Sequence, residues 1–178
     1  MITNVSLRDA TLGDAEAITE IYAHHVLNGT ASFDTVPRSC AETRNRIETC
    51  LKNGWPFLVA EVSGAVVAYA YATQFRERPA YASTCENSIY VRRDCLGKGI
   101  GKLLLAALER AATRRGFRQM IAVAGGGEAA SVGLHKSLGF REAGRMEAVG
   151  RKFGTWLDTV YLQLPLGLGA DSPPATEP

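Results

Sequence analysis

Residues 97–102 read Gly-Lys-Gly-Ile-Gly-Lys and lie between a β-rich run at 85–91 and an amphipathic stretch at 100–114. Glycine allows a tight turn and lets a ligand approach the backbone, so this order predicts a strand, a turn and a helix. The unpaired N–H groups and the positive end of the helix dipole then meet beside two lysines, an arrangement that favours phosphate. We therefore predict a phosphate-binding loop with contacts from Gly97, Lys98, Gly99, Ile100, Gly101 and Lys102.

Two common phosphate-binding motifs do not fit this segment. A P-loop requires Ser or Thr after its Gly-Lys pair, whereas Leu103 follows Lys102 here and the spacing is one residue short. A dinucleotide fingerprint requires a third glycine at a position that Lys102 or Leu104 occupies. A merely flexible start of a helix remains the alternative, although three alternating glycines are costly for a plain cap.

The segments before the loop predict two helices and several strands. Apolar residues at helical spacing follow capping boxes at 11–14 and 39–42, and β-rich runs surround a Ser-Gly turn at 63–64. In chain order the expected elements are a strand at 5–8, a helix ending at 28–29, a helix ending at 53–54, a hairpin of 57–62 and 65–73, and a strand at 85–91.

The segments after the loop complete an α+β fold, with one mixed sheet and helices on its faces. The long helix ends at 114–116, where cations precede a glycine, and Ser131 is the expected N-cap of a short helix that closes at Gly139. The Gly-, Pro- and Ser-rich residues 165–178 predict a mobile tail outside a single domain at 1–164. The remaining expected strands are 119–124, 140–149 and 156–164.

The composition excludes several classes of protein. Of 178 residues, 46% are hydrophobic and 21% charged, and the net charge of +2 is too small to indicate a nucleic-acid partner. No apolar run is long enough for a membrane span, and no secretory signal is visible, which predicts a cytoplasmic protein with no membrane partner. The four cysteines form no CxxC pair, so we expect reduced thiols and no metal site; they are Cys40, Cys50, Cys85 and Cys95.

Several motifs in collinear order over residues 4–164 resemble the GCN5-related N-acetyltransferases (GNATs), and within them the phosphinothricin and methionine sulfoximine–methionine sulfone acetyltransferases. Gly99 and Gly101 match the glycines of the family pattern Q/R-x-x-G-x-G/A, whose first position is Leu96 here. Residues 131–140 resemble the late motif that ends in Leu-Gly-Phe. The other matching segments are 21–24 (Ile-Tyr-Ala-His), 30–33 (Thr-Ala-Ser-Phe), 75–76, 80–81, 86–91 (Glu-Asn-Ser-Ile-Tyr-Val) and 150–158 (Gly-x-Lys-x-Gly-x-Trp-x-Asp).

The resemblance implies the GNAT fold, a mostly antiparallel twisted sheet of six to seven strands with about four helices. It implies acetyl-CoA as co-substrate, no metal, a small-molecule amine as acceptor and a homodimer. The segments 30–34 and 152–158 are then partly interfacial.

The resemblance also assigns catalytic residues. Glu86 corresponds to the family's general base, and strand alternation places it on one face with Ser88 and Tyr90. Its alternative role is a solvated carboxylate on a strand. His135 stands where many relatives carry a Tyr that protonates the leaving thiolate, although a helical histidine is often simply packed.

Further cofactor contacts follow from the same resemblance. Backbone N–H groups of Ile89, Tyr90 and Val91 are expected to serve the acetyl and pantetheine groups on a splayed strand. Glu128 replaces the usual Asn and, when ionised, can only accept hydrogen bonds. Ser131 fits a polar cofactor contact as well as an N-cap.

The acceptor is expected to bind beside two arginines. Arg76 and Arg78 suit a carboxylate or a tetrahedral oxygen group, whereas the alternative is a solvated basic loop. The resemblance adds Phe33, Tyr81, Asn87 and Ser88 as neighbours.

Together these features predict an acetyl-CoA-dependent N-acetyltransferase acting on the α-amine of a small amino-acid analogue. Within the enzyme class, a polyamine, an aminoglycoside or a protein N-terminus remains an alternative acceptor, and two nearby arginines disfavour such cations. From another class, an acyl-CoA-binding sensor without turnover remains open.

Overall fold

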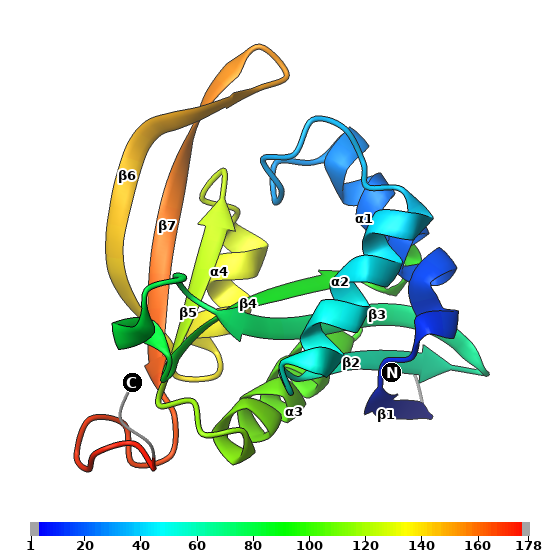
Figure 1. Ribbon diagram of the computed structural model, residues 1–178. Helices are drawn as coiled ribbons and strands as arrows, with labels where there is room; N and C mark the ends of the chain where they lie inside the picture. The colour runs from blue at the N-terminus through cyan, green and yellow to red at the C-terminus, as the bar shows by residue number, and fades with distance from the viewer. Residues whose placement is uncertain (1–3, 176–178) are drawn as a thin grey trace.

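A computed structural model describes residues 4–175 as one seven-stranded sheet in the order β1-β2-β3-β4-β5-β7-β6 (Figure 1). Only the β4–β5 pair is parallel, and the other five pairs are antiparallel. The predicted mixed, mostly antiparallel sheet is therefore confirmed. The strands are β1 (Val5–Asp9), β2 (Phe57–Val62), β3 (Ala65–Gln74), β4 (Thr84–Val91), β5 (Gln119–Gly125), β6 (Arg141–Lys152) and β7 (Thr155–Pro165).

Two helices cover each face of the sheet. On one face α1 and α2 pack against Phe57, Val59 and Tyr69, while the alternate residues of the same strands face α3 and α4 on the other. The helices are α1 (Ala15–Asn28), α2 (Cys40–Lys52), α3 (Ile100–Arg114) and α4 (Ala129–Lys136), with short 3-10 turns at Leu12–Asp14, Pro79–Tyr81 and Arg93–Cys95. Within residues 4–175, no helix has the length and apolar character needed to cross a membrane.

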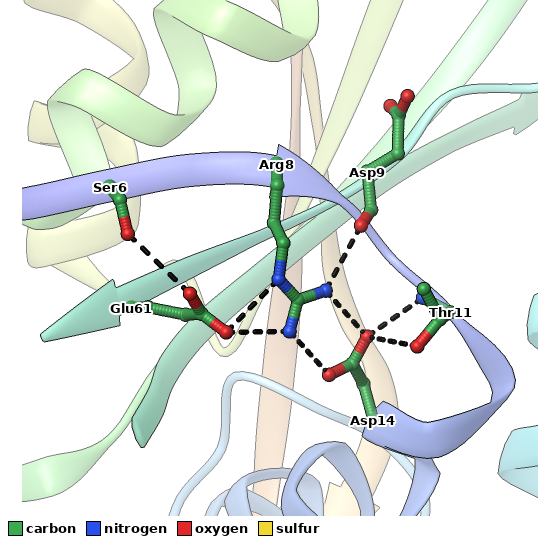
Figure 2. A network of polar contacts seen from close by, with 6 residues as sticks. All are labelled: Ser6, Arg8, Asp9, Thr11, Asp14 and Glu61. Atoms are coloured by element: carbon green, nitrogen blue, oxygen red, sulfur yellow. Dashed lines mark hydrogen bonds and ion pairs between the residues drawn. The ribbon is translucent and has the colours of Figure 1, made fainter. Parts of the chain in front are cut away.

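A charged network fastens the first strand to the start of α1 (Figure 2). Arg8 donates to both carboxylate oxygens of Asp14 at 2.7 and 2.8 Å and to Glu61 Oε1 at 2.6 and 3.0 Å. Asp14 Oδ2 also accepts from the backbone N and the hydroxyl of Thr11, which is the predicted capping box. Arg8 holds the pKa of Asp14 down at about 2. The network thus ties β1, β2 and the first helical turn together.

The second capping box is confirmed, whereas the predicted start of the short helix is wrong. Ser39 Oγ accepts from the backbone N of Glu42, and Glu42 Oε2 accepts from the backbone N of Ser39. The short helix α4 has Glu128 as its N-cap, so Ser131 lies inside the helix rather than before it. The helix begins earlier because the preceding glycines, in left-handed conformation, end the turn after β5 sooner than the sequence pattern indicated.

The hairpin of β6 and β7 is longer than predicted and projects beyond the body of the sheet (Figure 1). A bulge between Met146 and Gly150 holds Ala148 at φ 53°. Asp158 stabilises the bulge, since its carboxylate accepts from the backbone N of Ala148 and from Arg145, each at 3.0 Å. The hairpin leaves Met146, Val149, Phe153 and Trp156 exposed.

The start of the C-terminal segment contacts the core. Leu166 is buried, and Arg118 donates to the hydroxyl of Ser172 and the carbonyl of Pro173, each at 2.8 Å. The mobility expected for residues 165–178 stays a prediction, and residues 176–178 lie outside the part that the structure describes.

Candidate active site

The two parallel strands separate in the middle of the sheet. Thr84–Asn87 of β4 pair with 119–122 of β5, but beyond Asn87 β4 keeps only its partner β3 while β5 continues along β7. Figure 1 shows the two strands diverging from this point. Residues 88–91 therefore present an edge without a β5 partner, which is the splay that the resemblance implied. A cavity of about 620 Å³ lies at this gap, lined by Ile89, Tyr90 and Val91 among others.

The glycine loop forms one end of the cavity. Gly97 and Gly99 have φ of 70° and 83°, a left-handed conformation that only glycine adopts without strain, and Gly99 is the N-cap of α3. The first N–H groups of α3 have no intrahelical acceptor, so they are available to a ligand. A Cβ on Gly101 would lie 3.4 Å from the side chain of Leu134, so glycine also keeps α3 close to α4. The cavity lining includes Gly97, Gly99, Ile100, Gly101 and Lys102; Lys98 is in the loop but not in the lining.

Glu86 lies on the cavity wall at the point where the strands begin to separate. It shares a face of β4 with Ser88 and Tyr90, and Tyr90 packs against the rings of Tyr22 and Tyr69. Burial raises the pKa of Glu86, an effect that the charge of Arg76 opposes. Among residues 4–175 no side chain forms a hydrogen bond with its carboxylate. A half-buried carboxylate of this kind accepts a proton more readily than an exposed one.

His135 is buried on the opposite wall and uses both ring nitrogens. Nδ1 lies 2.8 Å from the carbonyl oxygen of Ser131, and Nε2 lies 3.1 Å from Asn87 Oδ1. Asn87 Nδ2 donates to the carbonyl of Ile121 at 3.3 Å. Burial lowers the pKa of the His135 imidazole. The structure thus turns Asn87 toward α4 and His135, on the face of β4 opposite to Glu86.

The loop between α1 and α2 forms the other end of the cavity, with Ser32, Phe33 and Asp34 in its lining. Lys152 of β6 holds this loop, because its buried Nζ donates to the carbonyls of Gly29 and Ser32 at 2.8 and 2.7 Å. The Phe33 ring lies directly on Gly150 of β6, where a Cβ would come within 2.3 Å of the ring.

Three consecutive glycines bring the end of β5 against the same loop. Gly126 and Gly127 have φ of 65° and 59°, and a Cβ on Gly126 would lie 2.6 Å from Thr30 Oγ1. Gly125 and Gly126 therefore leave room for Thr30, whose backbone approaches the first and whose side chain approaches the second. Glu128 and Ser131, which follow them, both line the cavity, and their contacts with a cofactor stay a prediction.

Arg76, Arg78 and Tyr81 do not line the cavity, although the charge of Arg76 acts on Glu86 in its wall. They surround a shallow depression on the loop between β3 and β4, together with Gln74 and Phe75. Arg76 lies over the Phe75 ring at 4.1 Å and donates to its carbonyl oxygen.

Sequence reasoning did not select three polar residues that line the cavity, Tyr22, Arg38 and Tyr71. Tyr22 lies within a segment that carried the family resemblance, but nothing in the local pattern distinguished Arg38 from a solvated loop residue. Among residues 4–175 no group of three or more His, Cys, Asp or Glu side chains is placed to hold a metal ion.

Comparison with known proteins gives the family. Residues 7–161 match the acetyltransferase (GNAT) domain. The chain belongs to the GNAT acetyltransferase family. It is 48% identical over 157 residues to a phosphinothricin N-acetyltransferase of Alcaligenes faecalis, covering 88% of this chain and 80% of the relative. It is 41% identical over 164 residues to an L-methionine sulfoximine/L-methionine sulfone acetyltransferase of Pseudomonas aeruginosa, covering 92% and 95%.

Solved structures of GNAT acetyltransferases have the same fold as this chain. A phosphinothricin acetyltransferase from Sinorhizobium meliloti in complex with acetyl-CoA superposes with a TM-score of 0.95 at 48% identity, covering 97% of this chain and 94% of that one. An acetyltransferase from Salmonella typhimurium with acetyl-CoA gives a TM-score of 0.92 at 38% identity, covering 97% and 99%. The predicted family, branch, fold and enzyme class are confirmed.

Proposed function

We propose that this GNAT transfers the acetyl group of acetyl-CoA to the α-amine of a small amino-acid analogue of the phosphinothricin or methionine sulfone type. Relatives that carry these activities in their names match nearly the whole chain. The observation that carries the proposal is the position of Glu86, half-buried on the cavity wall where β4 and β5 separate.

The cavity suits acetyl-CoA, which when bound supplies the acetyl group as an activated thioester. Its volume of about 620 Å³ is in the range of small-molecule sites. The left-handed glycines and the first N–H groups of α3 suit the pyrophosphate, and Lys102 adds charge there. The backbone of Ile89, Tyr90 and Val91 lies free of β5 and suits the amides of the pantetheine arm.

Glu86 is the proposed general base. An ammonium cannot attack a thioester until it loses a proton, and Glu86 faces the cavity beside the free edge of β4. Burial, which raises the pKa of its carboxyl, makes the carboxylate a better proton acceptor.

His135 is the proposed proton donor to the leaving thiolate. Both ring nitrogens face oxygen atoms, so both contacts are satisfied only when the ring carries two protons. Burial favours the neutral ring, so a second proton would be released readily. The interaction with Asn87 must break or rearrange for Nε2 to reach the thiolate.

A homodimer would explain the position of Arg76, Arg78 and Tyr81. In one chain none of the three lines the cavity, although the charge of Arg76 acts on Glu86, and a second copy would bring further side chains to this edge. The exposed apolar residues of the β6–β7 hairpin support such an association. We also propose a cytoplasmic location, in keeping with four free thiols.

The function is tested by the release of free CoA thiol with five separate acceptors: phosphinothricin, methionine sulfoximine, methionine sulfone, spermidine and an aminoglycoside. Turnover confined to the first three is the expected result. Turnover with only the cationic acceptors would overturn the acceptor assignment, and acetyl-CoA binding without any turnover would favour the sensor alternative.

A dimer-completed site is tested by mixing two inactive variants, Glu86→Gln and Arg78→Gln. If Arg78 acts on the neighbouring copy's site, mixed dimers contain one intact site and activity returns on mixing. Light scattering at the same concentrations should give the mass of a dimer. A monomer, or a mixture that stays inactive, would contradict the proposal.

A further inference from the structure

We propose that Arg38 binds an oxyanion of the acceptor and so selects amino acids with a free carboxylate or phosphinate over amines that lack one. This inference rests on the proposed function and names the recognition element of the same site. Arg38 precedes α2, in the loop that closes one end of the cavity, and its guanidinium belongs to the cavity lining together with Tyr22 and Tyr71.

The ring of Tyr22 fixes the position of the guanidinium. Arg38 Cζ lies 4.3 Å above the ring centroid, and Nη2 donates to the Tyr22 hydroxyl at 3.2 Å. The Tyr22 hydroxyl is held in turn by Ser32 Oγ at 2.9 Å and by the carboxylate of Asp34. A flat cation stacked on a ring that is itself hydrogen-bonded is preorganised, so little freedom is lost when it binds a ligand.

The hydrogen-bonding capacity of Arg38 is only partly used. Nη2 donates to Tyr22 and lies 3.5 Å from Asp34 Oδ2, and the Tyr71 hydroxyl is a further hydrogen-bonding neighbour of this side chain. A guanidinium has five N–H groups. Among the described residues these three neighbours leave at least two of them for a bound oxyanion.

The local charge also favours an anion. Asp34 is the carboxylate beside Arg38, but its charge acts on Lys152 as well, and its Oδ2 already accepts from Tyr22. One carboxylate thus lies near two cations. The side chain of Arg38 is 27% exposed, so it is partly desolvated yet open to the cavity. An oxyanion there would be stabilised more than one bound to a fully exposed arginine.

The register of the sheet places Tyr71, the neighbour of Arg38, on the same face as the proposed base. Tyr71, beside Arg38, pairs with Ser88, and Ser88 is two residues from Glu86 on the same face of β4. Two residues of strand span about 7 Å. Because Arg38 and Glu86 line the same cavity, an acceptor bound there would direct its amine toward Glu86 and an oxyanion toward Arg38. The carboxylate and a phosphinate are oxyanions that would pair with the guanidinium by charge, whereas sulfonyl oxygens are neutral and would only accept its hydrogen bonds.

The test compares Arg38→Gln with the control Arg46→Gln. Arg46 also lies near Tyr71, at 5.9 Å from its ring, but is exposed and outside the cavity lining. The acceptors are phosphinothricin, methionine sulfone, the carboxamide of methionine sulfone, and methionine. We expect Arg38→Gln to lower kcat/KM about 10- to 100-fold for phosphinothricin and methionine sulfone, mainly through KM, with an unchanged Kd for acetyl-CoA. Arg46→Gln should behave as the wild type does.

The carboxamide of methionine sulfone lacks the carboxylate, and methionine lacks the sulfonyl group, so these two acceptors show which group Arg38 binds. If Arg38 binds the carboxylate, the carboxamide loses its sensitivity to Arg38→Gln while methionine keeps it; if Arg38 binds the sulfonyl or phosphinyl oxygens, the reverse holds. An equal loss with all four acceptors would mean that Arg38 only supports the loop, and would overturn the proposal. So would a preference for acidic acceptors that survives in Arg38→Gln.

A second variant keeps the test decisive if Arg38→Gln does not fold. Arg38→Lys retains the charge without the planar fork, so it should keep part of the preference for acidic acceptors and lose the rest. If Arg38→Lys shows the same relative kcat/KM values for all four acceptors as the wild type does, recognition by the planar guanidinium is contradicted. A wild-type enzyme that acetylates only cationic amines would instead refute the proposed function itself, independently of any Arg38 variant.

Discussion

Two arginines, Arg8 and Arg38, show how the same side chain serves the fold in one region and the site in another. Arg8 donates to two carboxylates and to the carbonyl of Asp9, and its three nitrogens all have acceptors (Figure 2). Arg38 has one carboxylate at 3.5 Å and one hydroxyl at 3.2 Å, and it borders a cavity. A guanidinium with all its donors used stabilises the fold, whereas one with donors to spare beside a cavity is available to a ligand.

The carboxylates of the two regions differ in the same way. Asp14 accepts from Arg8 and Thr11, and the pKa of its carboxyl is lowered to about 2. Glu86 is half-buried and has no hydrogen-bonding side chain among residues 4–175, and this burial raises the pKa of its carboxyl. Pairing with Arg8 therefore stabilises the charge of Asp14, while burial makes the ionised form of Glu86 less favourable.

The largest expected effect sharpens this comparison on the cavity side. Glu86→Gln keeps the shape of the side chain but removes the base, so kcat should fall about 10²- to 10⁴-fold. The Kd for acetyl-CoA, measured by calorimetry, should stay unchanged, and the wild-type rate should rise with pH through a value above that of an ordinary glutamate. Unchanged acetylation would exclude Glu86 as the base.

The complementary change at Arg8 should affect stability and spare catalysis. Arg8→Gln leaves Asp14 nearly buried without its cation, so we expect a loss of about 1–2 kcal/mol in urea unfolding, discounted because Arg8 is one-third exposed. Since pairing lowers the pKa of Asp14, its contribution is present above about pH 4 and is lost as the pH falls through about 2. If Arg8→Gln lowered kcat/KM and left the free energy of unfolding unchanged, Arg8 would serve the active site rather than the fold.

A third change tests whether β6 shapes the acceptor end of the cavity. In Gly150→Ala the new Cβ would lie 2.3 Å from the Phe33 ring, so the ring must move. We expect the KM for the acceptor to rise about tenfold, with little change for acetyl-CoA. Gly144→Ala, on the same strand and with open space around its Cα, is the matched control.

The smallest expected effect concerns Glu109 of α3, which lies outside the cavity lining and forms no salt bridge among residues 4–175, although the charge of Arg110 acts on it. Its Oε1 is buried without a hydrogen bond, and burial raises its pKa to about 6. The folded state favours the protonated form, so this contribution to stability is complete below about pH 4.5 and is lost as the pH rises through 6. Glu109→Gln should therefore gain less than about 1 kcal/mol at pH 8 and nothing at pH 4. Equal gains at both values would exclude the ionisation of Glu109 as the cause.

The sequence by itself determined the order of the elements, the family and the glycine loop. Capping boxes, the Gly97–Lys102 segment and strand alternation act over a few residues, so their physical consequences are local and readable from one stretch of chain. The start of α4 was misplaced because Gly126 and Gly127, with positive φ, end the preceding turn early.

Only the tertiary structure decided which charged residues share the cavity. Arg76 and Arg78 follow β3 and looked suited to an acceptor, yet they lie on a separate loop, while Arg38 comes to the cavity from the loop before α2. The separation of β4 from β5 beyond Asn87 also depends on each strand's other neighbour. Such contacts join residues far apart in the sequence, and their geometry is set by packing of the whole sheet rather than by any local pattern.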